Sequence, residues 1–417
     1  MFSSPGKGID SREGWWLALG GLAFYAVLTI GFITTSHATR TAVLIVRWSA
    51  IVIVLSICIA LVASRALSRR AVLALAAYIG FLVLAVSLSV VYGGFTVLPI
   101  DIAIQAMVTA VGVILWIGSD DRFWTWRLPQ FVVWYSVLCV GILVMAGGFA
   151  PDLPPRYVFD FIEDRNDEAV GYSQEISKLF GIAAIAVVSI MAGWRTTLKL
   201  VFGVLIVLAF LMLSFLGGAR GDSVAALLVV AAAIFARSPL LGVSLFVAIS
   251  AAIFYAAPGS LQDIMIVQRL LWTIDGDMGE RDQLLLQSLQ LLADNPHCAI
   301  AGCGAGFFQF SYGFPYQRYP HNVIAEAFIT FGLPLALIYF AVLAVGVRSF
   351  ARQKGWLSFP VLLFGYFFII SMKSSDLFMN PFLTLLSLFF ISRWVFGAGV
   401  MAGDRGGLTS VFSARGR

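Results

Sequence analysis

Residues 319–346 read YPHNVIAEAFITFGLPLALIYFAVLAVG, and this stretch decides the fold class. Apart from Glu326, everything after the first four residues is apolar or nearly so. A helix needs roughly 20 such residues to cross the hydrocarbon core of a bilayer. Backbone polar groups in lipid must be satisfied within the segment, which favours a helix. We therefore predict a membrane-spanning helix over residues 322–346, with His321 and Asn322 at its mouth.

The same pattern recurs along the chain, which is 60% hydrophobic and only 12% charged. Soluble domains carry about 25% charged residues. We expect the first apolar run to stay in the protein, because it is long enough to span. The sequence predicts an all-α polytopic membrane protein with about 12 transmembrane helices, near residues 14–34, 43–63, 71–91, 97–118, 130–148, 177–194, 199–217, 221–236, 240–257, 322–346, 357–373 and 379–397.

In chain order this pattern divides the sequence into four parts. Helices 1–9 occupy residues 1–257, a large loop occupies 258–320, helices 10–12 occupy 321–397, and a tail occupies 398–417. Most of the 27 lysines and arginines fall before the first helix, in the segments that follow every second predicted helix, and in the tail. The positive-inside rule then places both termini in the cytoplasm and the large loop on the opposite side. The net charge of +5 reflects topology and does not suggest nucleic-acid binding.

The large loop is predicted to be partly helical, with amphipathic helices at Leu261–Trp272 and Glu280–Leu292. A glycine-rich turn and an aromatic segment, residues 307–319, follow. The aromatic rings could stack on sugars or anchor the loop at the membrane interface. Cys298 and Cys303 lie in this loop on the side away from the cytoplasm, which would be oxidising in a bacterium. A disulfide is one expectation for them, and two small residues packed in a turn is the other.

Three residues stand out against the apolar background. Arg220 lies at the tip of a helix hairpin, where burying its charge costs about 2.5–3.5 kcal/mol or more; the alternative is an arginine that snorkels or pairs with Asp222. Arg281 opens the second amphipathic helix of the loop. The partial positive charge of the helix N-terminus is expected to keep His321 neutral, as a general base must be.

Four neighbours of His321 are candidate supporting residues. Asn322 and Glu326 are one turn apart and share a helix face. Glu326 is an acid inside an apolar segment and needs a partner, although it could be a purely structural glutamate. Arg318 and Tyr319 precede the helix directly. We expect no metal site and no cofactor, because the one acidic triplet of the large loop, Asp275-Gly276-Asp277, reads as a solvated turn.

Three blocks, in their order and spacing, resemble the O-antigen ligase and polymerase superfamily, bacterial membrane proteins that share the "Wzy_C" region. The resemblance covers roughly residues 200–345. The blocks are Gly218-Ala219-Arg220-Gly221, then Arg281 with Asn295-Pro296 and Gly302-x-Gly304-x-Gly306-x-Phe308, and finally Pro320-His321-Asn322 with Glu326 and Gly332.

This resemblance implies a GT-C-like fold in the bacterial inner membrane. It implies a metal-independent, inverting glycosyltransferase that moves a glycan from undecaprenyl diphosphate to a sugar hydroxyl at the periplasmic face. Arg220 and Arg281 would bind the diphosphate, since arginine forks match phosphate oxygens. His321 would be the base, or would hydrogen-bond the diphosphate. The implied partners are the lipid-linked donor, a glycan or lipid A core acceptor, membrane lipids and a chain-length regulator.

Several functions remain open on this sequence. O-antigen ligases tend to have a small residue or Tyr three positions after the glycine, whereas Leu335 stands three positions after Gly332 here. We therefore favour a polymerase of O-antigen or exopolysaccharide repeat units over a ligase. From other classes, a secondary transporter is a rival because of the helix count, although such proteins usually show repeats and matched broken helices. A flippase for the lipid-linked glycan would need cations inside the helices, and Arg47 is the one expected there.

Overall fold

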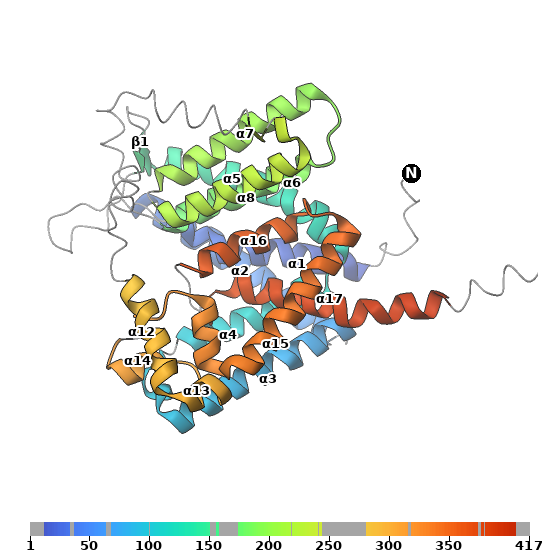
Figure 1. Cartoon of the computed structure of the whole chain (residues 1–417). Helices are drawn as coiled ribbons and strands as arrows, with labels where there is room; N and C mark the ends of the chain where they lie inside the picture. Colours follow the sequence, from blue (N-terminus) through green and yellow to red (C-terminus); the bar gives the residue numbers. More distant parts are fainter. Residues whose placement is uncertain are drawn as a thin grey trace, which may run out of the picture. The chain divides into compact units, whose positions relative to one another are not determined.

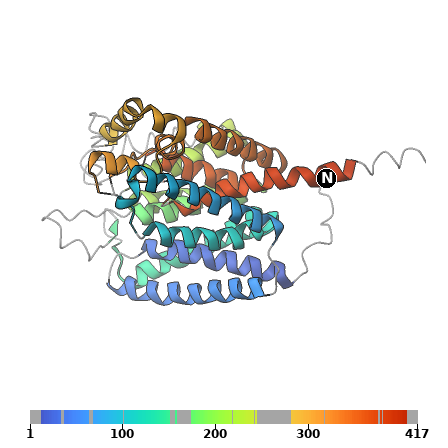
Figure 2. The same cartoon turned by 90° about the horizontal axis from the view of Figure 1, so that it is seen from below.

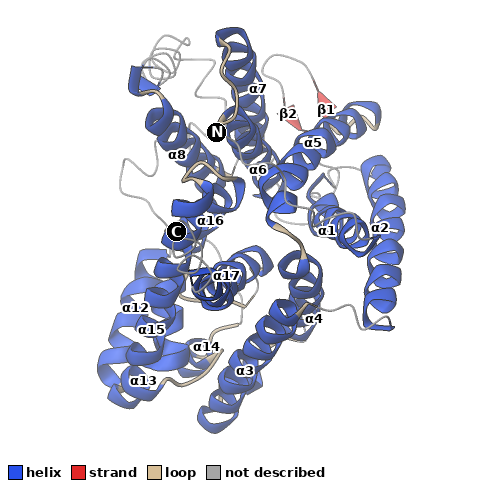
Figure 3. Cartoon of the chain, turned by 90° about the vertical axis from the view of Figure 1, so that its right-hand side faces the viewer, coloured by secondary structure: helices blue, strands red, loops and turns tan. Residues whose placement is uncertain are grey.

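The computed structural model describes residues 12–33, 37–63, 68–99, 101–150, 156–157, 174–217, 219–240, 242–243, 281–315, 318–373, 377–378 and 380–405. Its described secondary structure is helical except for β1 (Phe149–Ala150) and β2 (Arg156–Tyr157), which pair antiparallel (Figure 3). The predicted all-α class therefore holds apart from one small hairpin that the sequence patterns did not indicate.

Seven helical segments in the described residues are long and apolar enough to cross a membrane. They are Trp15–Ile33, Ala38–Leu61, Arg69–Tyr92, Phe123–Met145, Gln174–Met191, Thr197–Leu216 and Val323–Lys354. Three shorter apolar helices are Ile102–Ile117, Phe359–Ser371 and Pro381–Val395. The chain is thus a polytopic membrane protein. The prediction of about 12 spans is not confirmed, and most of the predicted run 240–257 lies outside the described residues.

The chain forms two compact units, and neither is continuous in sequence. The first comprises residues 1–64, 119–280 and 357–373. Its elements are α1 (Arg12–Thr29), η1 (Ile30–Ile33), α2 (His37–Ala63), η4 (Phe123–Arg127), α5 (Leu128–Met145), β1, β2, α6 (Gln174–Met191), α7 (Thr197–Leu216), α8 (Arg220–Arg237) and α16 (Phe359–Ser371).

Helix α6 forms the core of this first unit. Every residue from Ile176 to Val188 except Lys178 is buried, as expected for a helix that is apolar all round. It contacts α5, α7, α8 and α16 (Figure 1). Gly181 allows the close approach of α16, because a Cβ there would lie 2.9 Å from the Tyr366 hydroxyl. Helices α1 and α2 pack side by side in the same unit (Figure 2).

The second unit comprises residues 65–118, 281–356 and 374–417. Its elements are α3 (Arg69–Tyr92), η2 (Gly94–Val97), α4 (Asp101–Gly112), η3 (Val113–Ile117), α12 (Arg281–Asp294), α13 (Pro296–Ala301), α14 (Phe307–Tyr312), α15 (Val323–Lys354) and α17 (Pro381–Arg405). Helices α15 and α17 approach closely at Gly346, where a Cβ would lie 2.8 Å from the Phe390 carbonyl oxygen. Small residues at such crossings are typical of membrane helices.

Two sequence predictions can be compared directly with this unit. The helix predicted at Glu280–Leu292 is α12, and Asn295-Pro296 ends it; the same Pro296 also starts α13, as proline often does at a first helical turn. The helix predicted at Leu261–Trp272 lies outside the described residues. Helix α15 begins where predicted but is broken at Gly332, which has φ 74° and ψ 160°.

Candidate functional site

Asn322 starts helix α15. Its Oδ1 accepts hydrogen bonds from the backbone N–H groups of Ile324 (3.0 Å) and Ala325 (3.1 Å). A cap of this kind stabilises a helix by about 1 kcal/mol. The side-chain oxygen is therefore engaged by the helix start, directly after His321.

His321 has a constrained backbone and a partly buried side chain. With φ 54°, it is the one non-glycine residue in the described part of the chain that has a positive φ. Histidine tolerates this region better than most residues, and such strain often marks functional positions. The imidazole lies against the Tyr319 ring, with the centroids 4.0 Å apart. Its Nδ1 is buried and has no hydrogen-bond partner among the described residues.

The electrostatics of His321 favour a neutral imidazole. Burial, and to a smaller extent the charge of Arg281, lower its pKa from 6.5 to about 4. The neutral form was expected, but from the field of the helix N-terminus. Desolvation and the charge of Arg281 are the two causes that lower the pKa here. At neutral pH, His321 can therefore accept a proton.

Arg281 is the first residue of α12 and is half-buried. It is far from His321 in sequence, yet its charge acts on the imidazole. The fold of the second unit thus brings together two of the three main predicted site residues. A guanidinium beside a neutral imidazole is an arrangement that can bind an anion and accept a proton.

Arg220, the third of the main predicted site residues, is the first residue of α8 in the first unit, and its side chain is not described by the structure.

A network of serine hydrogen bonds that the sequence analysis missed stabilises the helix hairpin next to Arg220. Ser177 and Ser214 each donate to the other's carbonyl, at 2.8 and 2.7 Å, and Ser223 donates to the Ser214 carbonyl at 2.9 Å. The sequence signal that could have indicated this network is the presence of serines near the ends of three apolar runs.

Glu326 has a hydrogen-bond partner, as predicted for an acid inside an apolar segment. It is 8% exposed, and its Oε2 accepts a 2.7 Å hydrogen bond from the backbone N–H of Leu377. This bond ties α15 to the segment that precedes α17. The contact fits the alternative in which Glu326 is a structural residue.

The aromatic segment is partly core. Phe308 is 2% exposed and belongs to a buried cluster that also includes Leu284, Leu291, Cys298, Cys303, Phe307 and Ile329. Tyr312 and Phe314 stack on each other and pack against this cluster. Phe310, in contrast, is 46% exposed, and sugar stacking and interface anchoring both stay predictions for the rings that are not buried. Tyr316 lies outside the described residues.

Arg318 is exposed, and its guanidinium carbon lies 5.6 Å from the centroid of the Phe314 ring. Electrostatic attraction between a cation and a ring face is expected at this distance. Arg318 is thus placed on the aromatic cluster, and Tyr319 is the neighbour that contacts His321.

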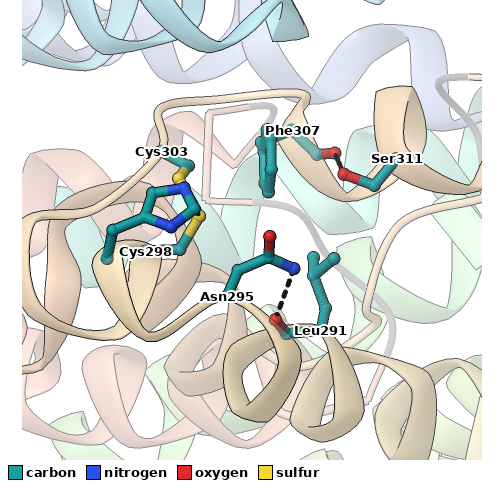
Figure 4. The surroundings of a disulfide bond; sticks show 7 residues. Leu291, Asn295, Cys298, Cys303, Phe307 and Ser311 are labelled. Atoms are coloured by element: carbon teal, nitrogen blue, oxygen red, sulfur yellow. Dashed lines mark hydrogen bonds between the residues drawn. A yellow bond between two sulfur atoms is a disulfide. The ribbon is translucent and has the colours of Figure 1, made fainter.

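Cys298 and Cys303 form a disulfide, with Cα atoms 5.0 Å apart (Figure 4). The His297 side chain lies beside it, with Nε2 3.5 Å from the Cys298 sulfur. These three residues form the one group with metal-ligand spacing in the described part of the chain, with their ligand atoms within 4.8 Å. A cysteine binds metal as a thiolate, so the disulfide form does not offer these sulfurs as ligands.

The chain matches no protein-family model, and it matches no curated protein.

Proposed function

We propose that this protein is a metal-independent, inverting glycosyltransferase that moves an undecaprenyl-diphosphate-linked glycan onto a sugar hydroxyl at the periplasmic face of the bacterial inner membrane. We favour polymerisation of O-antigen or exopolysaccharide repeat units. The observation that carries the proposal is His321, whose buried Nδ1 has no hydrogen-bond partner among the described residues and whose pKa is lowered by burial and by the charge of Arg281. The resemblance of residues 200–345 to the O-antigen ligase and polymerase superfamily supports it.

In the proposed reaction, the imidazole of His321 takes the proton of the acceptor hydroxyl. The hydroxyl oxygen forms a bond to the anomeric carbon on the face opposite the diphosphate. The bond between that carbon and the diphosphate oxygen breaks, and its electron pair leaves with the diphosphate. The configuration at carbon is thereby inverted. Proton transfer by a positioned base contributes typically 10²–10⁴-fold to such a rate.

Arg281 would hold the diphosphate, because arginine donates paired hydrogen bonds to phosphate oxygens and needs no metal, and the resemblance implies the same role for Arg220. Binding of the donor has a second effect on His321. Negative charge next to Arg281 offsets one of the two causes that keep the pKa of His321 low. The pKa would rise toward its usual range, so the imidazole becomes a stronger base when the donor is bound.

The break in α15 favours a second candidate, a secondary transporter. Broken membrane helices bind ions and substrates through freed backbone groups. Here the carbonyls of Ile329 and Thr330, just before the break, accept hydrogen bonds from Cys303 and Gly304. Since backbone N–H groups of the protein already bond these two carbonyls, the carbonyls are not free to bind an ion or substrate. For this reason we favour glycosyl transfer. A flippase is less favoured because Arg47 is exposed on α2.

The test uses purified protein in detergent with an undecaprenyl-diphosphate-linked repeat unit and no added metal. Release of undecaprenyl diphosphate and the size of the glycan are followed, with and without lipid A core. A glycan ladder without core supports the polymerase. Product that requires core supports the ligase, which shares donor and chemistry. An intact donor under both conditions contradicts glycosyl transfer and favours transport.

Three variants assign the roles in the same assay. His321→Ala, Arg281→Ala and Arg220→Ala should each abolish glycan formation while the protein remains in the membrane. Arg→Lys at 220 or 281 should also be poor, since a point charge cannot reproduce the arginine fork. Arg352→Ala, an exposed arginine near the far end of α15, is the matched control and should keep activity. Normal glycan from all three alanine variants would exclude these roles.

A further inference from the structure

The break in α15 leaves buried carbonyl groups without helical partners. In an unbroken helix, the carbonyl of Thr330 would accept from residue 334, but Pro334 has no N–H. Gly332 is non-helical, which interrupts the ladder around it. An unsatisfied carbonyl in a membrane protein costs several kcal/mol, so another group must supply the hydrogen bonds.

The glycine loop, residues 302–306, supplies them. The N–H of Cys303 donates to the Ile329 carbonyl at 2.7 Å, and the N–H of Gly304 donates to the Thr330 carbonyl at 3.1 Å. On its other side, the loop accepts a 2.7 Å hydrogen bond at the Ala305 carbonyl from Ser89 of α3. The loop is therefore docked between α15 and α3.

The docking explains the alternating glycines. Gly302 and Gly304 have φ 82° and 84°. A Cβ on Gly302 would lie 2.5 Å from the Thr330 carbonyl oxygen, and one on Gly304 would lie 2.1 Å from the Ser89 nitrogen. On α15, a Cβ on Gly332 would lie 2.4 Å from the Ile300 carbonyl oxygen. These glycines permit backbone-to-backbone contact, which leaves no room there for a ligand.

The disulfide closes this loop onto the neighbouring helices. Cys298 belongs to α13, and both sulfurs are fully buried, next to Phe307 and Asn295 (Figure 4). Asn295 in turn donates to the Leu291 carbonyl at 3.0 Å, which links the disulfide region to the end of α12. Arg281 lies at the other end of α12. The disulfide thus lies in the cluster that joins the helix carrying Arg281 to the helix that follows His321.

We propose that the Cys298–Cys303 disulfide is a positioning element for the Arg281–His321 pair, because it holds the glycine loop on the broken part of α15. The catalytic consequence rests on the proposed function, whereas the positioning itself does not. A thiol or phosphine reductant would supply two electrons, and two protons from water would convert the disulfide to two thiols. Only noncovalent contacts would then hold the loop.

The experiment measures the rate at which diethyl pyrocarbonate modifies His321, by peptide mass spectrometry, over a range of pH. The reagent attacks the neutral imidazole, so its pH profile reports the pKa of His321, on which the charge of Arg281 acts and against which the Tyr319 ring packs. With the disulfide intact, the rate should stay nearly level down to about pH 5.5. After reduction, it should fall with pH, by up to about tenfold at pH 5.5 if the pKa returns to its usual value near 6.5. His37, in the other unit, is the reference.

Cys298→Ala/Cys303→Ala should show the reduced profile and should not respond to reductant, because the remaining cysteines, Cys58 and Cys139, are buried and free. If this variant does not fold, Gly304→Ala disturbs the same loop with the disulfide intact and should shift the profile in the same direction. An unchanged His321 profile after reduction and in these variants would overturn the proposal. A shifted profile in a protein without glycosyl transfer would leave the positioning intact and reject the proposed function.

Discussion

At the scale of single residues, the site depends on one imidazole whose charge state is set by its surroundings. Desolvation is the larger cause of the low pKa of His321, and Arg281 is the smaller. The two causes can be separated experimentally, because only one of them is a removable charge.

Replacing Arg281 by Gln should raise the pKa of His321 only part of the way from about 4 to 6.5, because burial remains. The acidic fall of diethyl pyrocarbonate reactivity should move up in pH accordingly. Arg318→Gln is the matched control in the same loop; its guanidinium lies over Phe314, and the profile should not move. Equal shifts in both variants would mean that general charge, and not Arg281, acts on the imidazole.

The same residue predicts how stability depends on pH. The folded pKa is about 4 and the unfolded value is 6.5, so between these values the unfolded state binds more protons. The free energy of unfolding should therefore fall as pH decreases through that window. His321→Asn should weaken this dependence, which is measured as the difference in Tm between about pH 7 and about pH 5. An identical difference in wild type and variant would show that His321 titrates normally in the folded protein.

At the scale of elements, hydropathy is a local property, and it predicted several of the described helices close to where the structure has them. The predicted run 322–346 corresponds to α15, and 177–194 to α6. The docking of the glycine loop could not be predicted in this way. Its hydrogen bonds join Cys303 to Ile329 and Gly304 to Thr330, and no local pattern specifies which distant carbonyl a loop N–H will find. The glycines themselves were visible, but their packing role was not.

Substitution of Gly304 by Ala tests that packing role. The added Cβ meets the Ser89 backbone nitrogen at 2.1 Å, so we expect destabilisation by about 1–3 kcal/mol or more from crowding. Gly313→Ala isolates the backbone strain, since Gly313 has φ 64° but nothing within 4 Å. Gly80→Ala, in an open position of α3, should be nearly neutral. Thermal unfolding should rank the variants in that order, and equal effects at 304 and 313 would exclude crowding.

Glu326 offers a test of structural against catalytic use. Glu326→Gln keeps an oxygen acceptor for the Leu377 N–H, whereas Glu326→Ala leaves that buried donor unpaired at a cost of about 1–3 kcal/mol. We expect a clear loss of Tm in the alanine variant and a small one in the glutamine variant, which should also retain glycosyl transfer. A stable but inactive Glu326→Gln protein would assign the carboxylate to the chemistry instead.

At the scale of the whole molecule, two independent features lie at opposite ends of α15. The disulfide loop and His321 precede the helix, and disulfides persist in oxidising compartments. Arg348, Arg352 and Lys354 lie in its last turns, and basic residues concentrate on the cytoplasmic side. Both features predict the same orientation, with His321 outside the cytoplasm. The two features are physically independent, since one concerns redox chemistry and the other concerns insertion into the membrane.

Labelling of cysteines with a membrane-impermeant maleimide decides the orientation. Ser311→Cys and Gln353→Cys place thiols at exposed positions before and after α15. In intact cells with a permeable outer membrane, Ser311→Cys should react, and Gln353→Cys should react only after the inner membrane is opened. Wild-type protein is the control, because its free Cys58 and Cys139 are buried. The reverse pattern would place His321 on the cytoplasmic side. A lipid-linked glycan that is exported for polymerisation could not reach it there, so this result would contradict the proposed function.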